Sequence, residues 1–237
     1  MKKKKNIFYI KILILCFLIF IGIFILIKIS QFVFFRYFSI QDIITFQKDI
    51  ELSYLKGKNI FSINLKSIFD KLSEDYPQYR IKQIRIQLPN QLLIKSERRL
   101  PVAYVRLYRN FALDDEGVLF FDPESVAELP VIYGLETKLN YIKSGYRPRI
   151  KELHKALQLI HEFNRRDEFK KYKIKRINLE NSFSLTFFID GIEVRVSERI
   201  PESMGLLKAI LFKLNGETQK ISYIDLRFKE PIIKYEK

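Results

Sequence analysis

The longest apolar run of the chain lies close to its N-terminus. Residues 12–27, with the sequence ILILCFLIFIGIFILI, carry no polar side chain. Because a helix of roughly 20 apolar residues, rising ~1.5 Å per residue, can cross a bilayer, we predict a transmembrane anchor over residues 12–35. A cleaved signal peptide would have a shorter apolar core and a small-x-small cleavage site, whereas Lys28, Ser30 and Gln31 follow this run. A retained anchor is therefore expected.

Beyond the anchor, apolar positions first repeat with helical spacing. One stripe follows the order i, i+3, i+4, i+7 of an amphipathic helix: Leu65, Ile68, Phe69 and Leu72. Asn64 is a candidate N-cap and Pro77 ends the helix. Residues 79–88 then alternate as a half-buried strand, Pro89-Asn90 forms a turn, and residues 91–97 return as a second strand. We expect the helix stripe to face Ile84 and Ile86, while residues 37–46 form a preceding first strand.

The second half of the chain alternates strands with two helices. The elements predicted in chain order are strands within 102–108 and 111–122 with a turn at 115–117, a loop at 123–130, a helix over 150–163, a strand within 173–181, a hairpin within 184–197, a helix over 201–214 ending at Asn215-Gly216, and a last strand over 221–229. The hairpin is the clearest of these, because Asp190-Gly191 is a two-residue turn signal. It predicts the pairs Ile189–Ile192, Phe187–Val194 and Leu185–Val196 on one face, with Thr186 and Phe188 opposing Arg195 and Glu193 on the other.

Charge adds an orientation to this picture. Lys2 to Lys5 and Lys11 precede the apolar run, and no acidic residue occurs before Asp42. Basic residues that flank a first membrane helix remain in the cytoplasm. We therefore predict a cytoplasmic tail over residues 1–11, with everything after the anchor outside the cytoplasm. The net charge of +15 falls to +9 without the first 35 residues, which contain six of the 42 basic residues and none of the 27 acidic ones. Interspersed charges of both signs favour a solvated surface over a nucleic-acid partner.

Candidate chemistry changes the picture little. His154 and His161 lie two turns apart on one predicted helix, ~10 Å along its axis, which is too far for two ligands of one metal. Four acidic residues surround a glycine-containing turn, which favours a strand-linking turn over a metal site: Asp114, Asp115, Glu116 and Asp122. The single cysteine, Cys16, excludes a disulfide within the chain. No phosphate-loop, serine-hydrolase or zinc-protease motif is present. We expect no catalytic, cofactor or metal site and no small-molecule substrate, and hence a binding or scaffolding role.

An ordered series of short motifs resembles the FtsQ/DivIB family of bacterial cell division proteins. The residues that carry the resemblance are Gly57, Asn59-Ile60-Phe61, Pro77, Pro89, Leu92, Ile94, Glu97-Arg98 and Pro101-Val102-Ala103. Three later segments are also similar to that family: FALDDEGVLF (111–120), LPVIYG (129–134) and YIDLRF (223–228). The chain departs from the pattern at residues 45–56, where TFQKDIELSYLK lacks the Ser/Thr-x-Glu-Glu cap of the family's first helix.

The resemblance implies an α+β fold. Residues 36–100 would form a POTRA domain (β-α-α-β-β), and residues 101–237 a mostly antiparallel β domain with flanking helices. Glu97 would end the third POTRA strand and pair with a nearby arginine. The implied function is a non-enzymatic scaffold of the division septum, anchored in the plasma membrane, whose partners are FtsB-type and FtsL-type single-pass coiled-coil proteins. Two alternatives remain open: a POTRA-type chaperone or assembly module of an envelope export system, and an envelope hydrolase, for which no catalytic constellation is found.

A partner site is expected on the last strand. In ISYIDLRFK, one face would carry Ser222, Ile224, Leu226 and Phe228 against the core, and the other Tyr223, Asp225, Arg227 and Lys229. Proline lacks an N–H, so Pro231 suggests that this strand is a sheet edge, and an edge can accept an incoming strand. The resemblance points the same way, since the family's last strands receive the FtsB-type partner. We expect Tyr223, Arg227 and Tyr235 to contact its side chains, the alternative being an edge merely blunted by charges.

Overall fold

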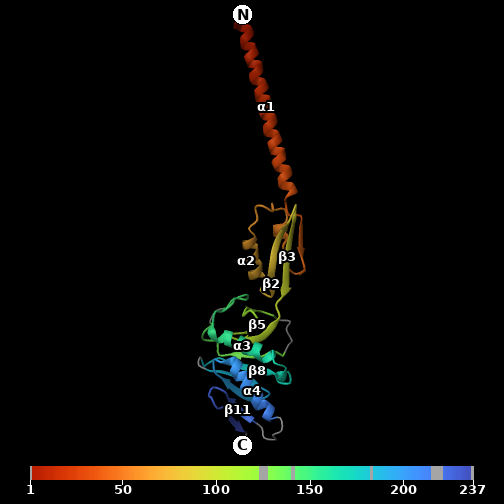
Figure 1. The fold of residues 1–237 in the computed structure, drawn as a ribbon. Helices are drawn as coiled ribbons and strands as arrows, with labels where there is room; N and C mark the ends of the chain where they lie inside the picture. The colour runs from red at the N-terminus through yellow and green to blue at the C-terminus, as the bar shows by residue number, and fades with distance from the viewer. Residues whose placement is uncertain (1, 123–127, 140–141, 182–183, 215–220, 236–237) are drawn as a thin grey trace. The chain divides into compact units, whose positions relative to one another are not determined.

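The apolar run forms one long helix, α1 (Lys2–Tyr37), in which Leu13–Tyr37 is long and apolar enough to span a membrane. The structure, a computed structural model, describes residues 2–122, 128–139, 142–181, 184–214 and 221–235. The chain divides into two compact units, residues 1–71 with 81–97 and residues 72–80 with 98–237. Figure 1 colours the ribbon from the N-terminus to the C-terminus and labels some of its helices and strands. The predicted α+β class is confirmed.

A three-stranded sheet lies at the centre of the first unit. Its spatial order is β1 (Asp42–Thr45), β3 (Gln91–Arg98) and β2 (Tyr79–Gln87), with β1 parallel to β3. Between β1 and β2 the chain forms α2 (Leu65–Asp75), preceded by a short 3₁₀ turn, η1 (Ser53–Leu55). The predicted order of strand, helical region, strand and strand is confirmed. The first helix of the β-α-α-β-β pattern is reduced to η1 among the described residues, at the position where the helix cap is missing from the sequence.

The burial of α2 corrects one prediction. The Ser67 N–H donates to Asn64 Oδ1 at 3.1 Å, so Asn64 is the N-cap as predicted. Ile68 and Leu72 are buried, but Phe69 is 40 % exposed and the prediction that it belongs to the core is wrong. Successive helix residues are rotated by about 100°, which turns Phe69 away from the row that Ile68 and Leu72 share.

The strand β2 also buries different residues from those expected. Tyr79 and Ile81 are buried, whereas Ile84 and Ile86 are half-buried. Leu88, the last apolar residue of the predicted alternation, lies in the β2–β3 turn and is 66 % exposed. The alternation found the strand but not its most buried end. Glu97 near the end of β3 forms an ion pair with Lys82 of β2, at 2.7 Å between Nζ and Oε1.

The second unit is built on a mixed sheet of nine strands. Their spatial order is β12-β11-β10-β9-β8-β7-β4-β5-β6. The strands are β4 (Pro101–Arg106), β5 (Asn110–Asp114), β6 (Leu119–Phe120), β7 (Val131–Tyr133), β8 (Ile174–Asn178), β9 (Leu185–Ile189), β10 (Ile192–Val196), β11 (Ile221–Asp225) and β12 (Ile232–Tyr235). Of these, β7 and β12 were not predicted from the sequence. The pairs β4–β7, β7–β8 and β10–β11 are parallel.

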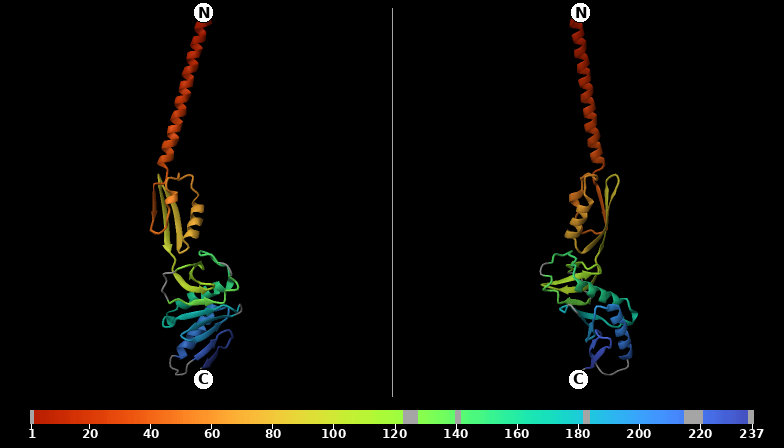
Figure 2. Two further views of the ribbon diagram at one scale, coloured as in Figure 1. Left: turned by 180° about the vertical axis from the view of Figure 1, so that it is seen from behind. Right: turned by 60° about the vertical axis from the view of Figure 1, so that its left-hand side comes forward.

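Two helices connect the parallel pairs. Helix α3 (Lys151–Asn164), followed by the 3₁₀ turn η2 (Asp167–Phe169), joins β7 to β8, and α4 (Ile200–Leu214) joins β10 to β11. Parallel neighbours need such a crossover. Figures 1 and 2 show both helices on the same face of the sheet. Side chains from both helices and from the strands beneath form one core, which includes Leu153, Phe163, Phe187, Val194, Met204 and Ile224.

The hairpin β9–β10 has the register that the sequence predicts. Ile189 pairs with Ile192, Phe187 with Val194, and Leu185 with Val196. Asp190 and Gly191 have φ angles of 46° and 91°, the left-handed values that a type I′ turn requires. Predictions for residues 123–127 and for Asn215-Gly216 lie outside the described residues.

Candidate partner-binding edge

The C-terminal end of the nine-stranded sheet differs from the single edge strand that we predicted. β11 ends at Asp225 rather than at Lys229, and it pairs with β10 on one side and β12 on the other. The edge position belongs to β12, which begins just after Pro231. This strand has only four residues, IIKY. So short a pattern cannot be distinguished as a strand separate from the alternating residues 221–229 before it.

One hydrogen bond sets the backbone directions in β11. The Leu226 N–H donates to the Arg195 carbonyl of β10 at 2.8 Å. Backbone groups of successive strand residues point to opposite sides, so Ile224 also faces β10. Tyr223 and Asp225 therefore direct their N–H and C=O groups toward β12.

The edge of β12 presents the backbone of one residue outward. Lys234 pairs with Tyr223, and Ile232 pairs with Asp225, and these are the hydrogen-bonded pairs. Ile233 lies between them, so its N–H and C=O point away from β11. In the described part of the chain, no strand pairs with that side of β12. An incoming strand would find at Ile233 a donor and an acceptor with the spacing of a β ladder.

Side chains near this edge differ between the two faces of the sheet. On the face away from the helices, Tyr223 has the Arg195 guanidinium 5.0 Å and the Lys234 Nζ 5.9 Å from its ring centroid. On the other face, Ile233 pairs with the fully buried Ile224. By alternation along β12, Tyr235 lies on that core side, opposite to Tyr223.

The segment after β11 does not continue the predicted alternation. Leu226 is buried as expected, but Phe228 is 54 % exposed, and Asp225, expected on the exposed face, is 3 % exposed. Lys229 is exposed and Ser222 half-buried. The alternation stops because β11 ends at Asp225, where the chain turns toward β12.

The turn is held by a bidentate pair between Asp225 and Arg227. Arg227 Nε donates to Asp225 Oδ1 at 2.9 Å, Nη2 donates to Oδ2 at 2.6 Å, and the Arg227 backbone N–H donates to Oδ1 at 3.1 Å. Burial alone would raise the pKa of Asp225, but the hydrogen bonds from Arg227 outweigh it and lower that pKa. The same hydrogen bonds raise the pKa of Arg227. Arg227, predicted to face solvent or a partner, is thus occupied within the chain.

A hollow of about 610 Å³ adjoins this turn. Exposed Phe228 and Lys229 contribute one wall, and Arg199, which precedes α4, contributes another with Glu202 and Leu206 of α4. The apolar parts of Phe228 and Leu206, which are 54 % and 38 % exposed, give this hollow a partly apolar lining beside charged side chains.

The acidic cluster of the β5–β6 turn binds arginines. The fully buried Asp114 carboxylate accepts hydrogen bonds from Arg80 Nη2, at 3.2 Å, and from Arg99 Nη1. Its other oxygen accepts the N–H groups of Glu116 and Val118, at 3.0 and 2.8 Å. This arrangement supports the prediction of a strand-linking turn. The arginine partners, 34 and 15 residues away in sequence, were not predicted.

Metal ligands do not gather in the residues that the structure covers. No group of three or more His, Cys, Asp and Glu side chains is placed to hold a metal ion among them. His154 and His161 are both exposed on α3, as helix-surface residues.

Comparisons with known proteins point to one family. The family model described as "Cell division protein FtsQ/DivIB, C-terminal" matches residues 103–227, which run from within β4 to the turn after β11 and include both helices of the second unit. A protein named Cell division protein FtsQ from Syntrophotalea carbinolica is 26 % identical over 182 residues, covering 75 % of this chain and 64 % of that protein. Proteins of the same name from Geotalea daltonii and a Geobacter species are 26 % and 28 % identical, covering 79 % and 75 % of this chain.

The matched part spans about two thirds of these relatives. It covers 69 % of the Geotalea protein, and just under two thirds of the Geobacter and Syntrophotalea proteins, 65 % and 64 %. The family model includes β11 and the turn residue Arg227 that follows it, but it ends before β12 begins.

Proposed function

Because the chain belongs to the FtsQ/DivIB family of cell division proteins, we propose that it is a membrane-anchored, non-enzymatic scaffold of the division septum. It links cytoplasmic and extracytoplasmic division proteins through protein–protein contacts. Its partners are FtsB-type and FtsL-type single-pass proteins. We expect no cofactor in this role.

The anchor orients the scaffold. The lysines before residue 12 hold the N-terminus in the cytoplasm, and α1 crosses the membrane once. Both units after α1 then lie outside the cytoplasm, in the periplasm if the cell has an outer membrane. Contacts made there reach the cytoplasm only through α1 and the basic tail.

The partner contact is a strand added to β12. The observation that supports it is the outward direction of the Ile233 N–H and C=O at the end of a nine-stranded sheet. A partner segment would extend the sheet there, taking its hydrogen bonds from the backbone and its specificity from alternate side chains. Ile232 and Lys234 would meet those side chains on one face, and Ile233 and Tyr235 on the other.

Residues of the predicted partner site take new roles in this arrangement. Tyr223 lies one strand inside the edge, where it orders Lys234 through the cation–π contact. Arg227 holds the turn through Asp225 and leaves Phe228 and Lys229 beside the hollow at α4.

The proposal is tested by removing one N–H group. Ile233→Pro deletes the outward donor and leaves the hydrogen bonds to β11 in place, because those involve Ile232 and Lys234. Ile233→Ala is the matched control, since it shortens the side chain and keeps the N–H. The full-length chain, solubilised from membranes in detergent, should retain an FtsB-type partner as wild type and as the Ala variant, and lose it as the Pro variant.

Two outcomes would contradict the proposal. Equal retention of the partner by the Pro and Ala variants would exclude strand addition at β12. Capture of unfolded outer-membrane proteins in place of coiled-coil division proteins would favour the alternative role as a chaperone or assembly module.

A further inference from the structure

The end of α1 is joined to the first unit without a flexible linker. The Ile40 N–H donates to the Lys58 carbonyl at 2.9 Å, and the Gly57 N–H donates back to the Ile40 carbonyl at 2.8 Å. The Ile60 N–H donates to the Phe38 carbonyl at 2.9 Å. The chain leaving the helix is therefore a paired segment of the folded unit from its first residues onward.

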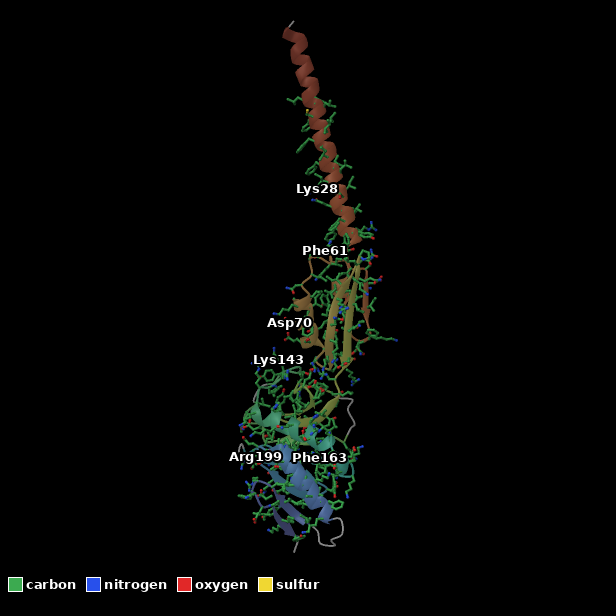
Figure 3. The ribbon with its side chains drawn as sticks, in the orientation of Figure 1. Lys28, Phe61, Asp70, Lys143, Phe163 and Arg199 are labelled. Atoms are coloured by element: carbon green, nitrogen blue, oxygen red, sulfur yellow. The ribbon has the colours of Figure 1, made fainter. Side chains whose placement is uncertain are left out.

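An exposed phenylalanine of this unit packs directly on the helix. The Phe61 ring stacks on Phe34, with centroids 6.0 Å apart and an interplanar angle of 13°, and lies 5.2 Å from Phe38. Figure 3 labels Phe61 beside the end of α1. Despite these contacts, Phe61 remains 63 % exposed. Much of its ring therefore has no protein cover among the described residues.

The position of Phe34 in α1 sets the depth of Phe61. The candidate span Leu13–Tyr37 has 25 residues. It is ~37 Å long at ~1.5 Å per residue, against a hydrocarbon core of ~30 Å, so its last turn lies at the membrane–water interface. Phe34 is in that last turn, and Phe61 in contact with it must lie at the same level. Aromatic side chains are enriched at this interface.

A second exposed apolar side chain lies at the same end of the unit. The Gln41 N–H donates to the Asn90 carbonyl at 2.9 Å, which brings the β2–β3 turn beside the first residues after α1. Leu88 in this turn is 66 % exposed. Phe61 and Leu88 belong to two separate segments that both adjoin the helix end.

The charge of this end fits a lipid surface. We call residues 32–41, 52–63 and 88–90 the membrane-proximal tip. These three segments contain no Asp or Glu, and they carry the exposed cations Arg36, Lys56 and Lys58. Apolar side chains beside cations and without acids are typical of surfaces that contact anionic phospholipids.

We propose that the membrane-proximal tip is a lipid-contacting surface of the extracytoplasmic part. Phe61 and Leu88 enter the boundary between headgroups and acyl chains, and Arg36, Lys56 and Lys58 bind phosphate groups of anionic lipids. This contact holds the first unit against the bilayer and does not involve β12. It is therefore independent of the partner proposed above.

The sequence offers a clean probe, because the chain contains no tryptophan. Phe61→Trp and Leu88→Trp would each place a single tryptophan in the tip of the full-length chain, reconstituted in nanodiscs. The matched control is Phe46→Trp, because Phe46 is 68 % exposed in the same unit. Phe46 follows β1, which runs parallel to β3 and therefore away from the β2–β3 turn. At ~3.3 Å per residue, Phe46 lies about 20 Å beyond Ile40.

Quenching by lipids brominated on their acyl chains decides the proposal. Tryptophan emission from the Phe61→Trp and Leu88→Trp variants should be blue-shifted and strongly quenched, and emission from the Phe46→Trp variant should match that in unbrominated nanodiscs. Positions 61 and 88 no more quenched than position 46 would overturn the proposal. Quenching at position 61 but not at position 88 would show that the β2–β3 turn is not part of the lipid-contacting surface.

The cationic part is tested with headgroup charge. Quenching at position 61 should be stronger with brominated phosphatidylglycerol than with the same fraction of brominated phosphatidylcholine. The difference should shrink in a Lys56→Gln, Lys58→Gln background, in which Arg36 is kept and Phe61 is still replaced by tryptophan. Quenching that is independent of headgroup charge in both backgrounds would overturn the role of the lysines.

Discussion

Arg227→Ala tests the assignment of Arg227 to the fold rather than to a partner. In the structure its guanidinium makes the bidentate contact with Asp225, whose carboxylate is nearly inaccessible to water. The substitution removes these side-chain bonds and keeps only the backbone N–H of residue 227 for the carboxylate. A buried charge is left with one donor.

The expected loss follows from that geometry. Removing one partner of a fully buried hydrogen-bonded charge pair costs about 3–5 kcal/mol. The Arg227 side chain is 33 % exposed, and the Asp225 carboxylate keeps its backbone donor, so water and that donor recover part of the loss. We expect a destabilisation of about 2–3 kcal/mol in the free energy of opening of β10 and β11.

Amide hydrogen exchange of the full-length chain in detergent measures this free energy locally. The slowest amides of β10 and β11 should exchange roughly 30–150-fold faster in the variant at neutral pH, the equivalent of ~2–3 kcal/mol. Lys229→Ala, an exposed substitution two residues away, should stay within about 0.5 kcal/mol of wild type.

The effect depends on pH with a defined sign. Asp225 has a lower pKa in the folded chain than in the unfolded one, because Arg227 hydrogen-bonds its charged form. The pair therefore stabilises the fold above the unfolded pKa of ~3.9, and that contribution is lost as pH falls through the folded pKa. The difference between wild type and Arg227→Ala should shrink below about pH 4. A difference under about 0.5 kcal/mol at neutral pH, or one that persists unchanged at about pH 3, would refute the structural role.

Three further predictions concern the rest of the chain. Leu72→Ala should destabilise the fold by about 2–5 kcal/mol and Phe69→Ala by less than about 1.5 kcal/mol, because of the two side chains only Leu72 is buried. Urea unfolding measures both losses, and equal losses would contradict the burial of α2. Gly134→Ala should lower the free energy of unfolding more than Gly191→Ala in the same assay. Both glycines have a positive φ, but only at Gly134 would an added Cβ meet backbone, 2.5 Å from the Glu180 nitrogen. A smaller loss at Gly134 would contradict this close approach. A reporter active only outside the cytoplasm, fused after Lys237, should be active, and an expressed but inactive fusion would reverse the orientation; loss of the first ~30 residues by mass would show cleavage of the anchor.

The sequence predicted best where a pattern was local and repeated. The β9–β10 hairpin was found with its register, because Asp190-Gly191 defines the turn and the flanking residues alternate cleanly. Helix α2 was found from its apolar stripe, and α3 and α4 were also predicted, within one or two residues of their observed bounds for most ends. Burial within a stripe was less certain, as Phe69 shows, because its outcome depends on which side of the helix meets the sheet.

The candidate site could be predicted only in part. Alternation indicated a strand over residues 221–229, but nothing local showed that it would end at Asp225, because its end depends on the Asp225–Arg227 pair in the turn that follows. β12 has four residues, and its edge position depends on the pairing of distant strands. The arginines that bind Asp114 are likewise distant from it in sequence, so a local sequence pattern could not predict these contacts.

Exchange of the Ile233 amide tests strand addition at β12 most directly. Its N–H points away from β11, whereas the N–H groups of Ile232 and Lys234 already face β11. When an FtsB-type partner saturates the full-length chain, the Ile233 amide should become strongly protected, and the amides of Ile232 and Lys234 should change much less. Unchanged exchange at Ile233 in the presence of bound partner would contradict the addition of a strand at this edge.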